Sequence, residues 1–120
     1  MGWMSPALAF RIAAILGFLA VAFGAFGAHA LKDLLERHQA LDYWKTAVLY
    51  HLAHAVALLF VASRNPLPLA AWVLFVVGIV LFSGSLYLMA ITQWRWLGPV
   101  TPLGGLCLLA GWIALALKAR

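Results

Sequence analysis

The sequence predicts an all-α protein, a four-helix transmembrane bundle with an amphipathic interfacial segment between the first and second spanning helices. Two observations predict this fold. Of the 120 residues, 67% are hydrophobic and only 9% are charged, which is too little polar surface for a water-soluble domain. The hydrophobic residues also gather into four segments, and four spans of about 20 residues each would use nearly the whole chain. We therefore expect a single integral membrane domain over residues 1–120.

The first span is predicted over residues 6–31. Ser5 is a candidate helix N-cap, and Pro6 suits the first position of a helix, where an N–H is not needed. No charged residue occurs from Ile12 to Ala28. A cleavable secretory signal is the alternative, because Ala28-His29-Ala30 resembles a cleavage site. The length of the apolar segment favours a membrane span over a signal.

The second predicted element is the amphipathic segment, over residues 32–43. Its leucines recur at helical spacing while charged residues occupy the other face, which is typical of a helix lying at the membrane interface. The second span follows over residues 44–63. It begins at Tyr43 and Trp44 and ends before Arg64, residue types that prefer head-group depth.

The third and fourth spans are separated by a connector that is rich in tryptophan, glycine and proline. Two prolines end the second span, and the third span, over residues 69–91, carries no charge. Thr101 and Pro102 repeat the order of a capping residue followed by proline. The fourth span is therefore predicted over residues 102–117.

The tryptophans are predicted to form two belts at head-group depth, one at each membrane face. Four spans would place Trp3, Trp72 and Trp112 near one face and Trp44, Trp94 and Trp96 near the other.

The positively charged residues divide equally between the two predicted membrane faces, so the positive-inside rule gives a tie. Cytoplasmic termini are favoured because all three acidic residues lie on the opposite face. Insertion in both orientations is the alternative. The residues counted are Arg11, Arg64, Lys118 and Arg120 on the face of the termini, and Lys32, Arg37, Lys45 and Arg95 on the other.

The charges and motifs argue against several functions. The net charge is +5, but the cations are scattered between apolar segments, so we expect no nucleic acid partner. The sequence contains no nucleophile elbow, zincin motif or P-loop, and no acidic residue lies inside a predicted span. We therefore expect no enzymatic activity, no cofactor, no metal and no small-molecule substrate that the sequence could identify.

Small residues recur along the predicted spans at helical spacing. Such stripes let helix backbones approach closely in lipid, where no hydrophobic force drives helices together. We expect helix packing from them rather than chemistry. The glycines assigned to packing are Gly17, Gly24, Gly27, Gly78, Gly84, Gly104, Gly105 and Gly111.

Two histidines on the second predicted span are the strongest candidates for a functional role. His51 and His54 are three residues apart and share a helix face. His54 lies near the middle of the span, where an ionisable side chain is costly unless it faces protein or water. The first interpretation is a neutral histidine that is hydrogen-bonded within the bundle to Tyr50, Ser83 or Ser85.

Two other interpretations of the histidine pair stay open. An oligomeric channel or transporter would place its path beside His51 and His54, and the absence of acidic residues from the spans argues against a carboxylate-based antiporter. A haem or metal site would need a further ligand from His29 or Cys107.

Several blocks of the sequence, in a fixed order, resemble one family. The blocks are Gly24-Ala25-Phe26-Gly27-Ala28-His29-Ala30-Leu31, Trp44-Lys45-Thr46-Ala47, Tyr50-His51 with His54-Ala55, Phe82-Ser83-Gly84-Ser85-Leu86-Tyr87, and Leu97-Gly98 through Thr101-Pro102-Leu103-Gly104-Gly105 to Gly111-Trp112. They resemble the YgdD-like family of small inner-membrane proteins. The resemblance implies a four-span protein of the bacterial plasma membrane and brings no biochemical activity with it.

The leading hypothesis is a non-enzymatic helical bundle that binds membrane lipid or another membrane protein, or that self-assembles into a homo-oligomer. The channel or transporter and the haem or metal site are the alternatives. The candidate functional polar cluster comprises His29, Tyr50, His51, His54, Ser83, Ser85, Tyr87 and Thr101.

Overall fold

The computed structural model describes residues 4–118, and every regular element in that range is helical. Four continuous stretches are long and apolar enough to cross a membrane, which confirms the predicted all-α fold with four spans. Trp3 and Arg120, which entered the predictions of tryptophan belts and orientation, lie outside the described residues. The elements are α1 (Pro6–Ala28), α2 (Lys32–Arg37), α3 (Leu41–Ala62), α4 (Leu69–Gly78), the π-helical turn η1 (Ile79–Ser83), α5 (Gly84–Thr92), the 3-10 turn η2 (Arg95–Leu97) and α6 (Val100–Leu117).

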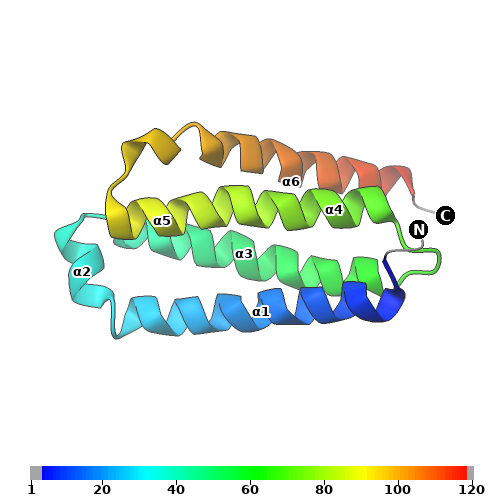
Figure 1. Cartoon of the computed structure of the whole chain (residues 1–120), viewed down its shortest axis with the longest axis horizontal. Helices are drawn as coiled ribbons and strands as arrows, with labels where there is room; N and C mark the ends of the chain where they lie inside the picture. The colour runs from blue at the N-terminus through cyan, green and yellow to red at the C-terminus, as the bar shows by residue number, and fades with distance from the viewer. Residues whose placement is uncertain (1–3, 119–120) are drawn as a thin grey trace.

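The spanning helices pack side by side in chain order (Figure 1). α1 packs on α3, α3 packs on the continuous rod formed by α4, η1 and α5, and α6 packs on the other side of that rod. The first residues of α1 and the last residues of α6 lie at the same end of the bundle, and α2 lies at the opposite end. Consequently α3 and the α4–α5 rod are central, and α1 and α6 are the outer helices.

The segment predicted to be one amphipathic element over residues 32–43 is divided in two. α2 ends at a turn in which Gln39 has a left-handed backbone, with φ 54°. The N–H of Ala40 donates to the carbonyl of Leu35 at 2.8 Å, a bond that closes a helix end of the Schellman type. α3 then begins at Leu41, ahead of the predicted start of the second span.

The two helix starts predicted from a capping residue and a proline differ. At α1, the Ser5 hydroxyl oxygen accepts a hydrogen bond from the N–H of Leu8 at 3.0 Å, as an N-cap should. At α6, the helix already begins at Val100, so Thr101 lies inside it. The predicted cap is wrong because the Thr101 hydroxyl bonds instead to the Ser85 hydroxyl of α5, 2.5 Å away.

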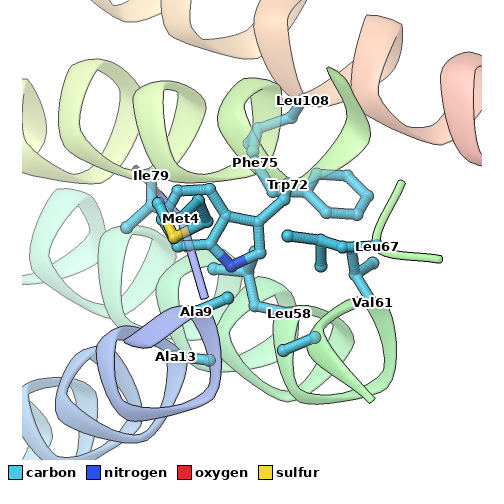
Figure 2. Packing of buried hydrophobic residues seen from close by; sticks show 11 residues of the cluster. Met4, Ala9, Ala13, Leu58, Val61, Leu67, Trp72, Phe75, Ile79 and Leu108 are labelled. Atoms are coloured by element: carbon cyan, nitrogen blue, oxygen red, sulfur yellow. The ribbon is translucent and has the colours of Figure 1, made fainter. Parts of the chain in front are cut away.

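The core at the end of the bundle that holds the start of α1 is built around Trp72 of α4 (Figure 2). Its indole is only 4% exposed and packs among side chains from α1, α3 and α4, including Leu58 and Phe75, and against Met4, which precedes α1. Trp44 is equally buried, at 4% exposure. Both indoles therefore fill the spaces between helices and do not lie on the outer surface of the bundle.

Glycines set the closest helix contacts. A Cβ at Gly104 of α6 would overlap the backbone of Phe82, so only glycine lets α6 approach η1 this closely. Similar overlap would occur at Gly27, Gly78 and Gly111. Gly84 differs from the other glycines predicted to pack, since no atom from another helix of the described chain lies within 4 Å of its Cβ position.

Candidate functional site

The two histidines of α3 are one turn apart but contact different helices. The Nδ1 atom of His51 lies 2.8 Å from the hydroxyl of Tyr87 on α5. The Nε2 atom of His54 accepts a hydrogen bond from the indole N–H of Trp112 on α6, with the nitrogens 3.0 Å apart. Both rings are buried, at 3% and 7% exposure. The pair is therefore two separate sites, one on each side of α3.

The His51 site is closed by aromatic side chains from three helices. The Tyr87 ring lies 4.9 Å from that of Phe23 on α1 and 4.7 Å from that of Trp44 on α3. The indole N–H of Trp44 donates to the backbone carbonyl of Phe23 at 2.7 Å, and the missing side chain of Gly27 leaves room for that indole. The Nε2 atom of His51 has no partner among residues 4–118. Within the described residues, the packed side chains around this ring leave it almost wholly buried.

The His54 site has all its ring hydrogen bonds filled. Its Nδ1 lies 2.8 Å from the carbonyl of Tyr50, and a carbonyl can only accept, so Nδ1 carries the proton and donates. Nε2 then uses its lone pair to accept from Trp112. The ring is therefore a neutral, fully bonded imidazole. Of the partners considered from the sequence, Tyr50 is the one bonded, through its backbone.

The remaining polar candidates are scattered. The Ser83 hydroxyl donates to the carbonyl of Ala47 at 2.8 Å, which joins η1 to α3. The Ser85 hydroxyl donates to the carbonyl of Phe82 and pairs with Thr101. His29 is exposed at the end of α1. The predicted polar residues thus form several separate contacts instead of one cluster.

Two residues at these sites were not singled out from the sequence for chemistry. Trp112 and Phe23 supply the closest partners on α6 and α1, yet Trp112 was assigned to a tryptophan belt. Their signal was present in part, because Trp112 belongs to the last block that carries the family resemblance. Nothing in the spacing pairs it with His54, which lies 58 positions away.

A groove opens beside His54 on the surface of the bundle. It has a volume of about 550 Å³ and runs between α3 and α6, with Tyr50, Phe82, Gly105 and Trp112 among its walls. Its outer edge includes exposed leucines of α6. In a bilayer crossed by these helices, a groove between two spans faces lipid chains rather than water.

A second hollow of about 650 Å³ lies at the end of the bundle opposite the start of α1. It is more polar and is lined by Gln39, Gln93 and Arg95 together with residues from the start of α6. Pro102 lines both hollows, so the polar pocket and the apolar groove are neighbours at the start of α6. The Nδ1 of His38 donates to the carbonyl of Ala90 at 2.9 Å and so joins the turn after α2 to α5 at this pocket.

Within residues 4–118, no three His, Cys, Asp or Glu side chains are grouped closely enough to hold a metal ion. His51 and His54 point to different helices, and the ring nitrogens of His54 are both bonded to protein groups. Cys107 is partly buried on α6. The ligand sets considered for a haem or metal site are therefore not brought together in the described part of the chain.

Comparisons with known proteins agree on a membrane family. A family model described as "Protein of unknown function (DUF423)" matches residues 23–105. The UPF0382 membrane protein YwdK of Bacillus subtilis is 42% identical over 115 residues, which cover 90% of this chain and 92% of that protein. A UPF0382 membrane protein of Haemophilus influenzae is 39% identical over 112 residues, covering 88% of this chain and 87% of that protein. A UPF0382 membrane protein of Schizosaccharomyces pombe is 35% identical over 109 residues, which cover 85% of this chain and 92% of that protein. No solved structure gives a significant match.

Proposed function

The chain belongs to the DUF423 family, whose relatives are the UPF0382 membrane proteins, and from this premise we propose that it binds one phospholipid in the groove between α3 and α6. The relatives carry no enzyme name, and we propose a non-enzymatic role for this chain. The observation that carries the proposal is the groove itself, which is lined mainly by apolar side chains and lies between two helices long and apolar enough to cross a membrane.

The dimensions of the groove suit an acyl chain. The stretch of α6 from Pro102 to Trp112 spans about 15 Å of helical rise, comparable with the length of an acyl chain in a bilayer. Gly105 leaves the floor of the groove open, because a Cβ there would meet only the ring of Phe82 at 3.7 Å. Trp112 is half exposed and forms one wall while its N–H bonds to His54.

The energetics limit what the groove alone can do. Lipid tails are as apolar as leucine, so moving one chain from the bilayer into the groove gains no hydrophobic free energy. Binding must come from van der Waals packing against the rigid walls and from contacts to the head group. A phospholipid whose acyl chain lies in the groove and whose head group lies in the neighbouring polar pocket meets that requirement, whereas an isolated apolar groove would not.

Lipid binding is better supported than transport by the same geometry. A proton or ion path beside the histidines needs a group that can exchange protons or ligands with water. The two ring nitrogens of His54 are instead engaged by Tyr50 and Trp112, and the groove opens sideways into the hydrocarbon layer. His51 is enclosed by aromatic rings on the other side of α3.

We propose further that the chain resides in the bacterial inner (plasma) membrane with both termini in the cytoplasm, and that it belongs to the narrower YgdD-like group. The family resemblance supports the location and the group. The three acidic residues at the α2 end support the orientation, because the counted cations are evenly divided. A protease-accessible tag at each terminus, tested in sealed inverted vesicles, would contradict this orientation if both tags were protected.

The test of lipid binding uses native mass spectrometry of the protein released from detergent micelles. We expect the wild-type chain to retain one phospholipid and Gly105→Leu to lose it, because the new side chain fills the groove. Gly84→Leu is the matched control, since its side chain would project into open space and leave the groove unchanged. Both variants must keep their helical circular dichroism.

Equal lipid retention by wild type and Gly105→Leu would overturn the proposal. If the wild type retained no lipid but formed a dimer, and Gly105→Leu made that dimer dissociate, the proposal would be overturned in favour of self-assembly through the same groove. Loss of lipid from Gly84→Leu as well would show that retention reflects the surrounding lipid shell and would also count against the groove.

A further inference from the structure

We infer that the polar pocket at the α2 end binds the anionic head group of the same phospholipid, with Arg95 as the partner of its phosphate. The inference rests on the proposed function and adds the class of lipid to it. It begins from position, because the pocket lies at one end of the bundle and shares the lining residue Pro102 with the groove between α3 and α6. The exposed, stacked rings of Trp94 and Trp96 beside the pocket are of the type that prefers head-group depth.

The charge of the pocket favours an anion. Arg95 is the charged residue among the described residues that line it, and no described acidic residue does so. The acidic residues of this end lie elsewhere, with Asp33 and Glu36 on the outer surface of α2 and Asp42 exposed at the start of α3. A guanidinium can hold a phosphate through two parallel hydrogen bonds. A zwitterionic head group would bring an ammonium into the pocket with no carboxylate lining it, so an anionic lipid is the better match.

Two glutamines in an unfavourable backbone conformation line the same pocket. Gln39 and Gln93 have φ values of 54° and 61°, and they are the non-glycine residues with positive φ in the described chain. Gln39 closes α2 by donating its N–H to the carbonyl of Glu36 at 3.0 Å, and Gln93 closes α5 by donating to that of Met89 at 2.8 Å. Glycine is the relaxed residue at such helix ends, because it has no Cβ to clash.

The turn geometry alone therefore does not explain why glutamine occupies these two positions. Their amide groups can donate hydrogen bonds to phosphate or glycerol oxygens, which glycine cannot do. Backbone strain tends to persist where a side chain serves a function. Two strained glutamines from separate helix ends, meeting at one pocket with an arginine, point to recognition of a polar head group.

The experiment measures which lipid the protein retains. Purified protein is exchanged into detergent containing equal amounts of phosphatidylglycerol and phosphatidylcholine with identical oleoyl chains, and native mass spectrometry gives the ratio of the two complexes. Both head groups offer a phosphate to Arg95, but phosphatidylcholine also brings an ammonium group close to the guanidinium, and two like charges repel each other. We therefore expect the wild type to prefer phosphatidylglycerol by about tenfold, which corresponds to about 1.4 kcal/mol. Arg95→Gln should reduce the preference to near unity.

Lys45→Gln is the matched control. It removes the same charge at the same end of the bundle, from an exposed residue of α3 that does not line the pocket. It should keep the tenfold preference. The double variant Gln39→Gly with Gln93→Gly provides a second measurement: it should raise the melting temperature of the lipid-free protein and lower the preference for phosphatidylglycerol.

Each outcome separates the inference from the function on which it rests. Equal retention of both lipids by the wild type, with Gly105→Leu still losing both, would overturn the head-group inference and leave the groove intact. An equal drop in preference for Lys45→Gln would also overturn it, since surface charge alone would then explain the effect. Thermal stabilisation by inorganic phosphate equal to that by phosphatidylglycerol would assign the pocket to a soluble anion. No retained lipid in any variant would overturn both proposals.

Discussion

The two sides of α3 hold the same residue type in opposite surroundings. His51 faces α5 and lies behind the rings of Phe23, Trp44 and Tyr87, with one ring nitrogen left without a partner in the described chain. His54 faces α6 at the wall of an open groove and has both nitrogens bonded. The hydrocarbon tails of lipids can supply no hydrogen bond, so a polar group beside an opening to those tails has to be bonded by protein.

The comparison teaches where binding can occur in this bundle. A buried histidine in the middle of a span suggests a functional site wherever it occurs. Here the histidine with the unfilled nitrogen is sealed, whereas the one beside an accessible hollow is chemically satisfied. Access from the membrane and chemical reactivity are therefore separated, which favours binding over catalysis or proton transfer at these residues.

The largest expected effect comes from adding one methyl group at Gly27, on the side of α3 where His51 is enclosed. Gly27→Ala should lower the free energy of unfolding by about 2 to 3 kcal/mol, because its Cβ would overlap the indole of Trp44. That indole has little freedom to move, since its N–H is bonded to the carbonyl of Phe23 at 2.7 Å. On the open side, Gly105→Ala should change stability by less than about 0.5 kcal/mol. Unfolding by dodecyl sulfate in mixed micelles measures both.

A control within α1 separates overlap from the loss of glycine. Gly17→Ala faces the same helix, but its Cβ would lie 4.0 Å from that of Ala55, which is an ordinary contact. It should behave like Gly105→Ala. If Gly27→Ala and Gly105→Ala were equally tolerated, the two sides of α3 would not differ in packing, and the contrast between closed and open sites would fail.

The sequence predicts the four spans better than it predicts the turns between helices. Hydropathy predicts the four spans because the bilayer itself imposes about 20 apolar residues on each crossing. The Ser5 cap could be predicted because the chemistry of helix starts is local. The helix ends at Gln39 and Gln93 could not, because the sequence signal for a left-handed helix end is glycine or asparagine. The division of the amphipathic segment was missed for that reason.

The site could be predicted only in part. His51 and His54 stand out because ionisable residues are rare and costly inside a span. Their partners depend on how each helix is rotated about its axis, and Tyr87 and Trp112 lie 36 and 58 positions away. Sequence spacing constrains contacts within a helix but not between helices. The groove itself depends on the same rotations, so no local pattern could reveal it.

The second prediction tests the buried hydrogen bond between His51 and Tyr87. Tyr87→Phe should lower the free energy of unfolding by about 1 to 2 kcal/mol, because it leaves His51 with no partner at either nitrogen. Tyr50→Phe is the matched change on the open side. His54 bonds to the backbone carbonyl of Tyr50, which phenylalanine keeps, so stability should not change. A larger loss for Tyr50→Phe than for Tyr87→Phe would reverse the comparison.

The smallest expected effect concerns the bond that crosses the groove wall. Trp112→Phe should cost only about 0.5 kcal/mol, the average value of a side-chain hydrogen bond between membrane helices. The nitrogen-15 shift of His54 Nε2 should nevertheless report loss of its donor. The cost is small because α6 is held to the central rod at Gly104 and Gly111, where the helices approach most closely, and not through α3. A cost above about 2 kcal/mol would exceed what one such bond supplies. It would mean that α6 depends on its contact with α3 for its position, and that the open side of α3 is packed as firmly as the closed side.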